Sequence, residues 1–132
     1  MKTAEFTTVI EEQIERSLSV LVEKAEEYAA DGDRLHNFKQ AAHLQGMTPR
    51  EALAGMMAKH TVSIYDMCHS GLVYPDHVIN EKITDHINYL LLLRALFEDE
   101  SRERSLADRQ ALRELREKLI GDPEPIHNNE EE

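Results

Sequence analysis

Residues 83–97 have the sequence ITDHINYLLLLRALF, and apolar side chains occupy nearly every side of a helix built from them. A helix of this kind is typical of the centre of a bundle, because neighbouring helices cover its faces. Its longest apolar run covers residues 89–93, far short of the roughly 20 residues that a membrane span needs. We therefore expect a central helix of an all-α protein with no membrane partner.

Helical patterns extend outward from this segment in both directions. Thr48-Pro49-Arg50-Glu51 combines an N-cap Thr, a Pro at the first helical position and a Glu three residues after the Thr, which is a strong helix start. The predicted helices cover residues 5–30, 34–44, 49–69, 75–97 and 102–119. In the first of them, one apolar stripe is expected to face the core: Phe6, Ile10, Ile14, Leu18, Leu21, Val22, Ala25 and Tyr28. Together they predict a four- to five-helix bundle.

Length and composition indicate one domain. The chain has 132 residues, of which 41% are apolar and 31% charged, as in globular proteins. We expect a single all-α domain over residues 1–120, with its core at about 5–97 and an extra helix at about 102–119, followed by a disordered acidic tail at 121–132.

Cys68 is the single cysteine, so no internal disulfide can form. With no recognisable signal peptide, we expect a cytoplasmic protein.

The charge balance argues against a polymeric nucleic acid as partner. Fifteen Lys and Arg face 26 Asp and Glu, which gives a formal net charge of −11. Binding to a phosphate backbone needs a basic stripe, and the sequence contains none.

Glu81, Asp85 and Asn88 lie within about 60° of one another on the predicted central helix, and apolar residues continue the same stripe. Buried carboxylates need a cation, a donor or a metal ion. Oxygen ligands one turn apart suit Mg²⁺, so we expect Glu81 and Asp85 to hold this ion. The alternative is that both acids only pair with cations such as Lys59 or Arg34.

The helix at 49–69 offers complementary groups beside its core stripe, which is formed by Leu53, Met56, Met57, His60, Ile64 and Met67. Lys59, Ser63 and Asp66 make a polar line about 100° to one side. Lys59 is a candidate phosphate contact, and Asp66 is a candidate further metal ligand. The alternative interpretation of this line is an exposed helix edge.

A family resemblance rests on spaced single residues between about 23 and 97: Tyr28, Gly32, Asn37-Phe38, Ala41-Ala42, Gly46, Met56-Met57, Lys59, Glu81, Asp85 and Tyr89. This order resembles small phage and prophage proteins related to MazG-like nucleotide pyrophosphohydrolases, including nucleotide-modification-associated domains. The resemblance implies an all-α bundle assembled as a dimer or tetramer, with Mg²⁺ as cofactor and a nucleoside triphosphate as ligand.

The resemblance also implies roles for individual side chains. A metal ion on the catalytic candidates Glu81 and Asp85 would neutralise phosphate charge and activate water. The expected substrate contacts are Lys59 and Arg34 on the pyrophosphate, and Asn37, Phe38 or Asn88 on the base or sugar. Active members of the family carry acid pairs three residues apart, whereas the two acids here are four apart, so hydrolysis stays open beside binding. The alternative function is a non-enzymatic helical interaction protein of a phage or prophage.

Overall fold

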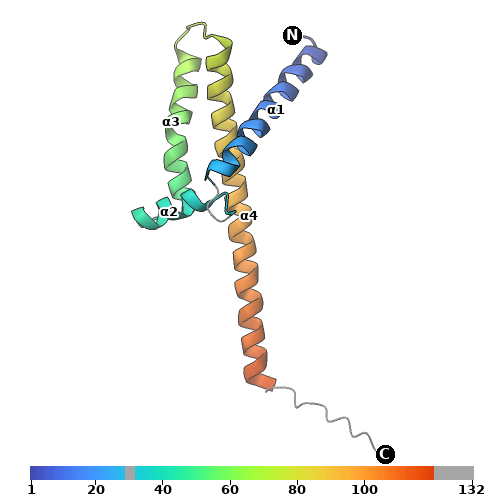
Figure 1. Ribbon diagram of the computed structural model, residues 1–132, viewed down its shortest axis with the longest axis vertical. Helices are drawn as coiled ribbons and strands as arrows, with labels where there is room; N and C mark the ends of the chain where they lie inside the picture. The colour runs from blue at the N-terminus through green and yellow to red at the C-terminus, as the bar shows by residue number, and fades with distance from the viewer. Residues whose placement is uncertain (29–31, 121–132) are drawn as a thin grey trace, which may run out of the picture. The chain divides into compact units, whose positions relative to one another are not determined.

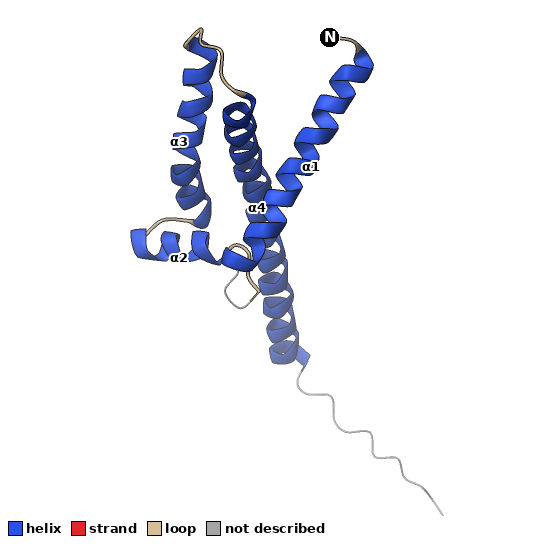
Figure 2. Ribbon diagram, turned by 45° about the horizontal axis from the view of Figure 1, so that its top comes forward, coloured by secondary structure: helices blue, strands red, loops and turns tan. Residues whose placement is uncertain are grey.

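The computed structural model describes residues 1–28 and 32–120, with the side chains of 25–28 left out. Four helices make up this part of the chain, without any strand: α1 (Thr3–Tyr28), α2 (His36–Gln45), α3 (Pro49–His69) and α4 (Asp76–Ile120), as Figures 1 and 2 show. The predicted all-α class is confirmed. The predicted disordered tail lies outside the described residues. The chain divides into two compact units, residues 1–97 and 98–132.

Local signals set the helix ends that the sequence predicts. At the start of α3, the Thr48 hydroxyl accepts a hydrogen bond from the Glu51 amide at 3.3 Å, and the Glu51 carboxylate accepts one from the Thr48 amide at 2.7 Å. Gly46 ends α2 in the left-handed region, at φ 65°, where its amide reaches the carbonyls of the last turn. Glycine adopts this conformation without steric cost. Both boundaries are confirmed.

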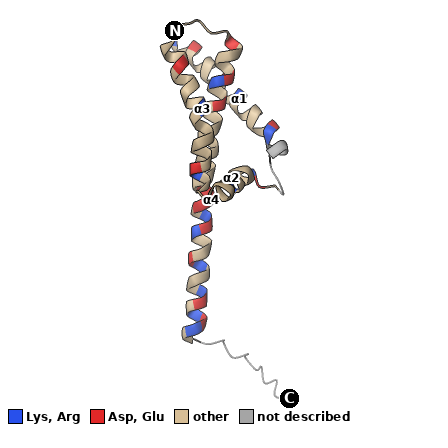
Figure 3. Ribbon diagram, turned by 90° about the vertical axis from the view of Figure 1, so that its left-hand side faces the viewer, with Lys and Arg blue, Asp and Glu red and all other residues tan. Residues whose placement is uncertain are grey.

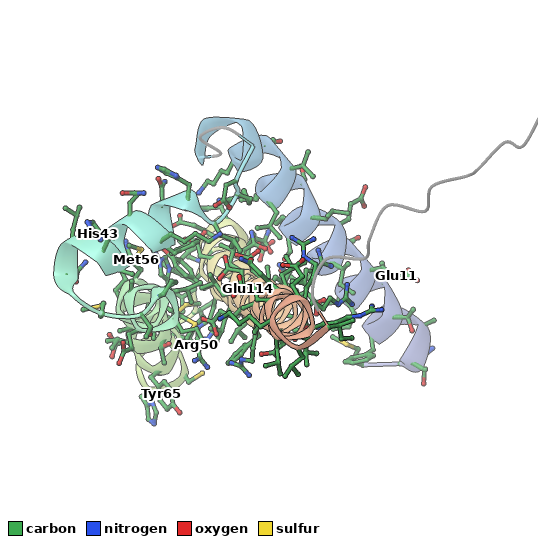
Figure 4. All side chains as sticks on the ribbon, turned by 90° about the horizontal axis from the view of Figure 1, so that it is seen from below. Glu11, His43, Arg50, Met56, Tyr65 and Glu114 are labelled. Carbon is green, nitrogen blue, oxygen red and sulfur yellow. The ribbon has the colours of Figure 1, made fainter. Side chains whose placement is uncertain are left out.

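The core of residues 1–97 joins α2, α3 and the first part of α4. Leu35, Phe38, Leu53 and Leu96 form its buried cluster, and partly buried residues pack against it: Met56, Tyr89, Leu92 and Leu93. Figure 4 shows Met56 between α2 and α3, whereas Tyr65 points away from both. The predicted core stripe of α3 is thus confirmed at Leu53, which is completely buried.

Helix α1 contacts α4 through polar side chains rather than through its apolar stripe. Gln13 donates a hydrogen bond to the Thr84 hydroxyl at 2.9 Å, and Arg16 donates one to the Asn80 amide oxygen at 3.1 Å. Ser17, whose hydroxyl accepts a hydrogen bond from Gln13, is buried. The first turns of α1 diverge from α4 (Figures 1 and 2). α1 therefore turns the face of Gln13 and Ser17 inward.

The apolar stripe of α1 is exposed, so the prediction that it faces the core is wrong for Phe6, Ile10, Ile14, Leu18 and Val22. The physical reason is geometric. Residues four apart advance about 40° around a helix, so a stripe with this spacing winds around the helix instead of following one straight contact. Leu21 alone of the described stripe members is half-buried.

Helix α4 continues without interruption through the residues where the sequence predicts a break between 97 and 102. That prediction is wrong, because residues 98–101 contain neither Gly nor Pro and Arg102 pairs with Glu98 at 3.2 Å, one turn away. Acidic and basic side chains are interspersed along residues 98–120 (Figure 3). Among the described helices, none combines the length and hydropathy that crossing a lipid bilayer requires.

Candidate functional site

A cavity of about 280 Å³ lies among the four helices of residues 1–97. This volume is close to the lower end of the range for small-molecule sites, about 300–1,000 Å³. α1 contributes Val20, Leu21 and Lys24, and α3 contributes Met56. The start of α2 and the residues before it contribute Arg34, Asn37 and Phe38, and α4 contributes Asp85, Asn88, Tyr89 and Leu92. Apolar walls with a few polar groups are typical of a ligand site.

Five of the residues that the sequence predicts as site residues meet at this cavity: Arg34, Asn37, Phe38, Asp85 and Asn88. They come from two segments about fifty residues apart in the chain. Helical spacing explains why Asp85 and Asn88 share a face of α4, but only the tertiary packing of α2, α3 and α4 brings the other three to them. The structure therefore assembles most of the predicted substrate contacts in one place.

Glu81 does not join this group. Its carboxylate is exposed and accepts a hydrogen bond from Lys82 at 2.8 Å. That hydrogen bond lowers the pKa of the Glu81 carboxyl group. Glu81 precedes Asp85 by four residues and is therefore rotated by about 40° from it, enough to turn it out of the cavity. The expected inward orientation of Glu81 beside Asp85 is wrong.

Lys59 and Asp66 also lie away from the cavity. Both side chains are exposed on α3, and neither lines the cavity. The polar line on α3 is thus an exposed helix edge, which is the alternative that the sequence left open. Lys59 is therefore not placed for a phosphate contact in this cavity, and Asp66 is not placed beside Asp85 as a metal ligand.

His60 supports Asp85 from α3. Its Nδ1 lies 3.5 Å from the Asp85 carboxylate, and its ring centroid lies 4.8 Å from that of Tyr89. Both of these partners line the cavity, whereas His60 does not. Burial lowers the pKa of the His60 imidazole, and the Asp85 carboxylate opposes this effect. His60 is placed to position Asp85 rather than to contact a ligand.

The lowered pKa of His60 predicts a stability loss on acidification. Below about pH 6.5, the usual pKa of histidine, the unfolded chain takes up a proton at this site more readily than the folded chain. The free energy of unfolding in metal-free buffer should therefore fall between pH 7.5 and about 5.5, and fall less in His60→Gln. Urea titrations at several pH values measure this difference. Parallel curves for the two proteins would contradict the assignment to His60.

Asn88 is the buried polar group of the cavity. Its side chain is 6% exposed, and its Oδ1 has no hydrogen-bond partner among the described residues. An unpaired buried amide costs about 1–3 kcal/mol, and native proteins rarely tolerate one without reason. A ligand that hydrogen-bonds to this amide would supply such a reason.

Lys24 and Tyr89 line the cavity although the sequence did not mark them as site residues. Tyr89 follows Asp85 by four residues, so helical spacing was a usable signal for its position on the same side of α4. No local pattern connects Lys24 to the cavity, because α1 reaches it only through tertiary packing.

The oxygen atoms that the cavity offers are suitable for Mg²⁺ only if the ion is already bound to a ligand when it enters. Among residues 1–28 and 32–120, no group of three or more His, Cys, Asp or Glu side chains could hold a metal ion. Mg²⁺ in proteins, however, often takes one or two carboxylates and completes its shell with water and phosphate oxygens. The Asp85 carboxylate with the neighbouring Asn88 amide matches that smaller requirement.

Comparison with known proteins identified no relative of this chain. The chain matches no protein-family model, and no curated protein or solved structure is significantly similar to it. The MazG-like assignment therefore stays a prediction from the sequence.

Proposed function

We propose that the cavity between α1, α2, α3 and α4 binds a nucleoside triphosphate together with Mg²⁺. A single observation carries this proposal: two cationic side chains, two aromatic rings, one carboxylate and one unsatisfied buried amide line the same cavity. The MazG-like bundle and the phage origin implied by the sequence resemblance belong to the same proposal, and the all-helical fold is compatible with them.

Each kind of side chain suits one part of such a ligand. Phe38 and Tyr89 offer aromatic rings against which a nucleobase packs. Lys24 and Arg34 are cations, and a guanidinium group binds phosphate oxygens with paired hydrogen bonds. A Mg²⁺ ion carried by the phosphates would find its protein oxygen at Asp85. Because the cavity has a volume of only about 280 Å³, part of a nucleoside triphosphate would extend beyond it.

The geometry supports binding more directly than hydrolysis. Asp85 is the one acid that lines the cavity among the described residues, since Glu81 is turned outward. Activation of a water molecule by Mg²⁺ is the chemistry that the bound ion would supply. His60 lies 3.5 Å from the Asp85 carboxylate and helps to position it, and Leu21, Met56 and Leu92 give the cavity apolar walls.

A thermal-shift experiment with a panel of ribo- and deoxyribonucleoside triphosphates, each with and without Mg²⁺, tests the proposal. A ligand at 100 times its dissociation constant stabilises the fold by about 2.7 kcal/mol, which raises the melting temperature by several degrees. Asp85→Asn should abolish the part of the shift that depends on Mg²⁺. The matched control Glu81→Gln, on the same helix but outside the cavity, should respond like the native chain.

Two results would reject the proposal: no shift with any nucleotide, or equal shifts in the native chain and Asp85→Asn. The release of pyrophosphate or phosphate, measured in the same samples, decides whether binding leads to hydrolysis.

The alternative is a helical interaction protein. Side chains of residues 101–120 are exposed throughout, including Leu106, Leu112, Leu115 and Leu119, each more than half exposed. Such a segment offers apolar surface to a partner protein. This alternative predicts no thermal shift with any nucleotide, so the same experiment separates the two functions.

A further inference from the structure

The polar side chains that line the cavity differ in how deeply they are buried. Lys24 and Asn37 are exposed, and Arg34 is half-buried. The Asp85 side chain is 27% exposed, whereas Asn88 is only 6% exposed. Among the described lining residues, the charged groups therefore lie nearer to solvent, and the neutral amide of Asn88 is the most deeply buried polar group.

Aromatic and aliphatic side chains accompany Asn88 in the buried part of the cavity. Phe38 is 7% exposed and belongs to the buried cluster of the core, and Tyr89 and Leu92 are half-buried and pack against that cluster. All three residues line the cavity together with Asn88. The buried part of the lining thus offers rings and aliphatic carbon around a neutral amide, an environment that favours an uncharged ring over a charged group.

The Asn88 amide limits which ligand groups can satisfy it. An amide presents an N–H donor and a carbonyl acceptor side by side, and the Oδ1 of Asn88 has no hydrogen-bond partner within residues 1–28 and 32–120. A group that offers a donor and an acceptor next to each other satisfies both, as the edges of nucleobases do. Phosphate oxygens are acceptors alone, and their charge is costly to bury.

We propose that a nucleotide occupies the cavity with its base innermost, and that the Asn88 amide recognises the hydrogen-bonding edge of this base. The charged phosphates then lie at the exposed side, near Lys24 and Arg34, where water still solvates them. This base-first orientation rests on the proposed function and adds to it a residue that determines base specificity.

Burial also favours the base over a metal ion as the partner of Asn88. The amide oxygen has the chemistry to join Asp85 in binding Mg²⁺. Mg²⁺, however, loses its water reluctantly and usually keeps several water molecules in proteins. The more exposed Asp85 carboxylate suits such a hydrated ion better than the buried amide does. We therefore assign the ion to Asp85 and the base to Asn88.

Isothermal titration calorimetry tests the contact with ATP, GTP, CTP and UTP and with two analogues whose bases carry no hydrogen-bond donor, purine riboside triphosphate and 2-pyrimidinone riboside triphosphate. The preferred nucleotide should bind the native chain at least about tenfold more tightly than the purine or pyrimidine analogue that corresponds to it. In Asn88→Ala, the preferred nucleotide should weaken to the affinity of the analogue, whereas the analogue should bind as it does to the native chain. A purely structural role of Asn88 would weaken both ligands alike.

Thr84→Val is the matched control. Thr84 lies one turn before Asn88 on α4 and is equally buried, but it does not line the cavity. This variant should therefore keep the full preference for the nucleotide over its analogue. Circular dichroism checks that both variants retain the helical fold.

The orientation of the ligand is tested by the positions at which it tolerates a bulky group. A fluorophore on the terminal phosphate of the preferred nucleotide should leave binding intact, because the phosphates lie at the exposed side. A benzyl group on the donor nitrogen of the base should abolish binding, because this nitrogen faces Asn88. Competition with the unmodified nucleotide, followed by fluorescence anisotropy, measures both effects.

Four outcomes would overturn this assignment while nucleotide binding itself persists. These are equal affinities of the native chain for nucleotides and donor-free analogues, equal losses for both ligands in Asn88→Ala, a loss in Asn88→Ala that appears only with Mg²⁺, and tolerance of the benzyl group but not of the fluorophore. The third outcome would place Asn88 on the metal ion. The absence of binding by any nucleotide would instead reject the proposed function together with the base-first orientation.

Discussion

Leu53→Ala is expected to lower the free energy of unfolding by about 3 kcal/mol. Leu53 is completely buried in α3 and belongs to the same cluster as Phe38 and Leu96. Truncation removes the transfer free energy of the lost carbons and leaves a void that the neighbouring helices fill only in part. Because the buried cluster has few members, one truncation should remove a large share of a total stability of about 5–15 kcal/mol.

Urea denaturation followed by circular dichroism measures this loss. All samples should have the same protein concentration, because association would make the stability concentration-dependent. Val62→Ala is the matched control, since it lies on the same helix with 58% of its surface exposed and should cost well under about 1 kcal/mol. Equal losses for the two variants would contradict the placement of the core between α2, α3 and α4.

Asn88→Leu is expected to raise the free energy of unfolding by about 1–2 kcal/mol and to abolish the thermal response to nucleotides. The native amide is buried with an unpaired oxygen, so an apolar replacement removes a desolvation cost. The adjoining cavity accommodates the larger side chain. A residue that costs stability in the free protein and is needed for binding is typical of a functional site.

Thr84→Val is the control for this prediction. Thr84 lies one turn before Asn88 on α4 and is equally buried, but its hydroxyl accepts a hydrogen bond from Gln13. Its replacement should therefore lower the stability by about 1 kcal/mol. Opposite signs for the two variants, measured by urea denaturation, support the assignment of Asn88. A destabilised Asn88→Leu would instead show that the native amide is satisfied, which removes the main support for a ligand at this position.

The sequence predicted five of the residues that line the cavity, but it also assigned residues to the site that lie outside the cavity. Asp85 and Asn88 were identified from helical spacing, and Arg34, Asn37 and Phe38 from the resemblance and their charge or ring. Glu81 was misplaced, because an angular difference of about 40° is too small for a helical projection to separate an inward side chain from an outward one. A helical projection gives the angular spacing of residues on one helix, but it does not give the direction from which the next helix approaches.

The sequence by itself determined where α2 ends and where α3 begins. Thr48 with Glu51 starts α3, and Gly46 ends α2, through hydrogen bonds and backbone conformations that involve only residues within one helical turn. Only the tertiary structure decided which face of α1 turns inward. α1 turns the buried Ser17 and the half-buried Gln13 inward and leaves most of its apolar stripe in water, because the choice depends on the surfaces that distant parts of the chain bring into contact.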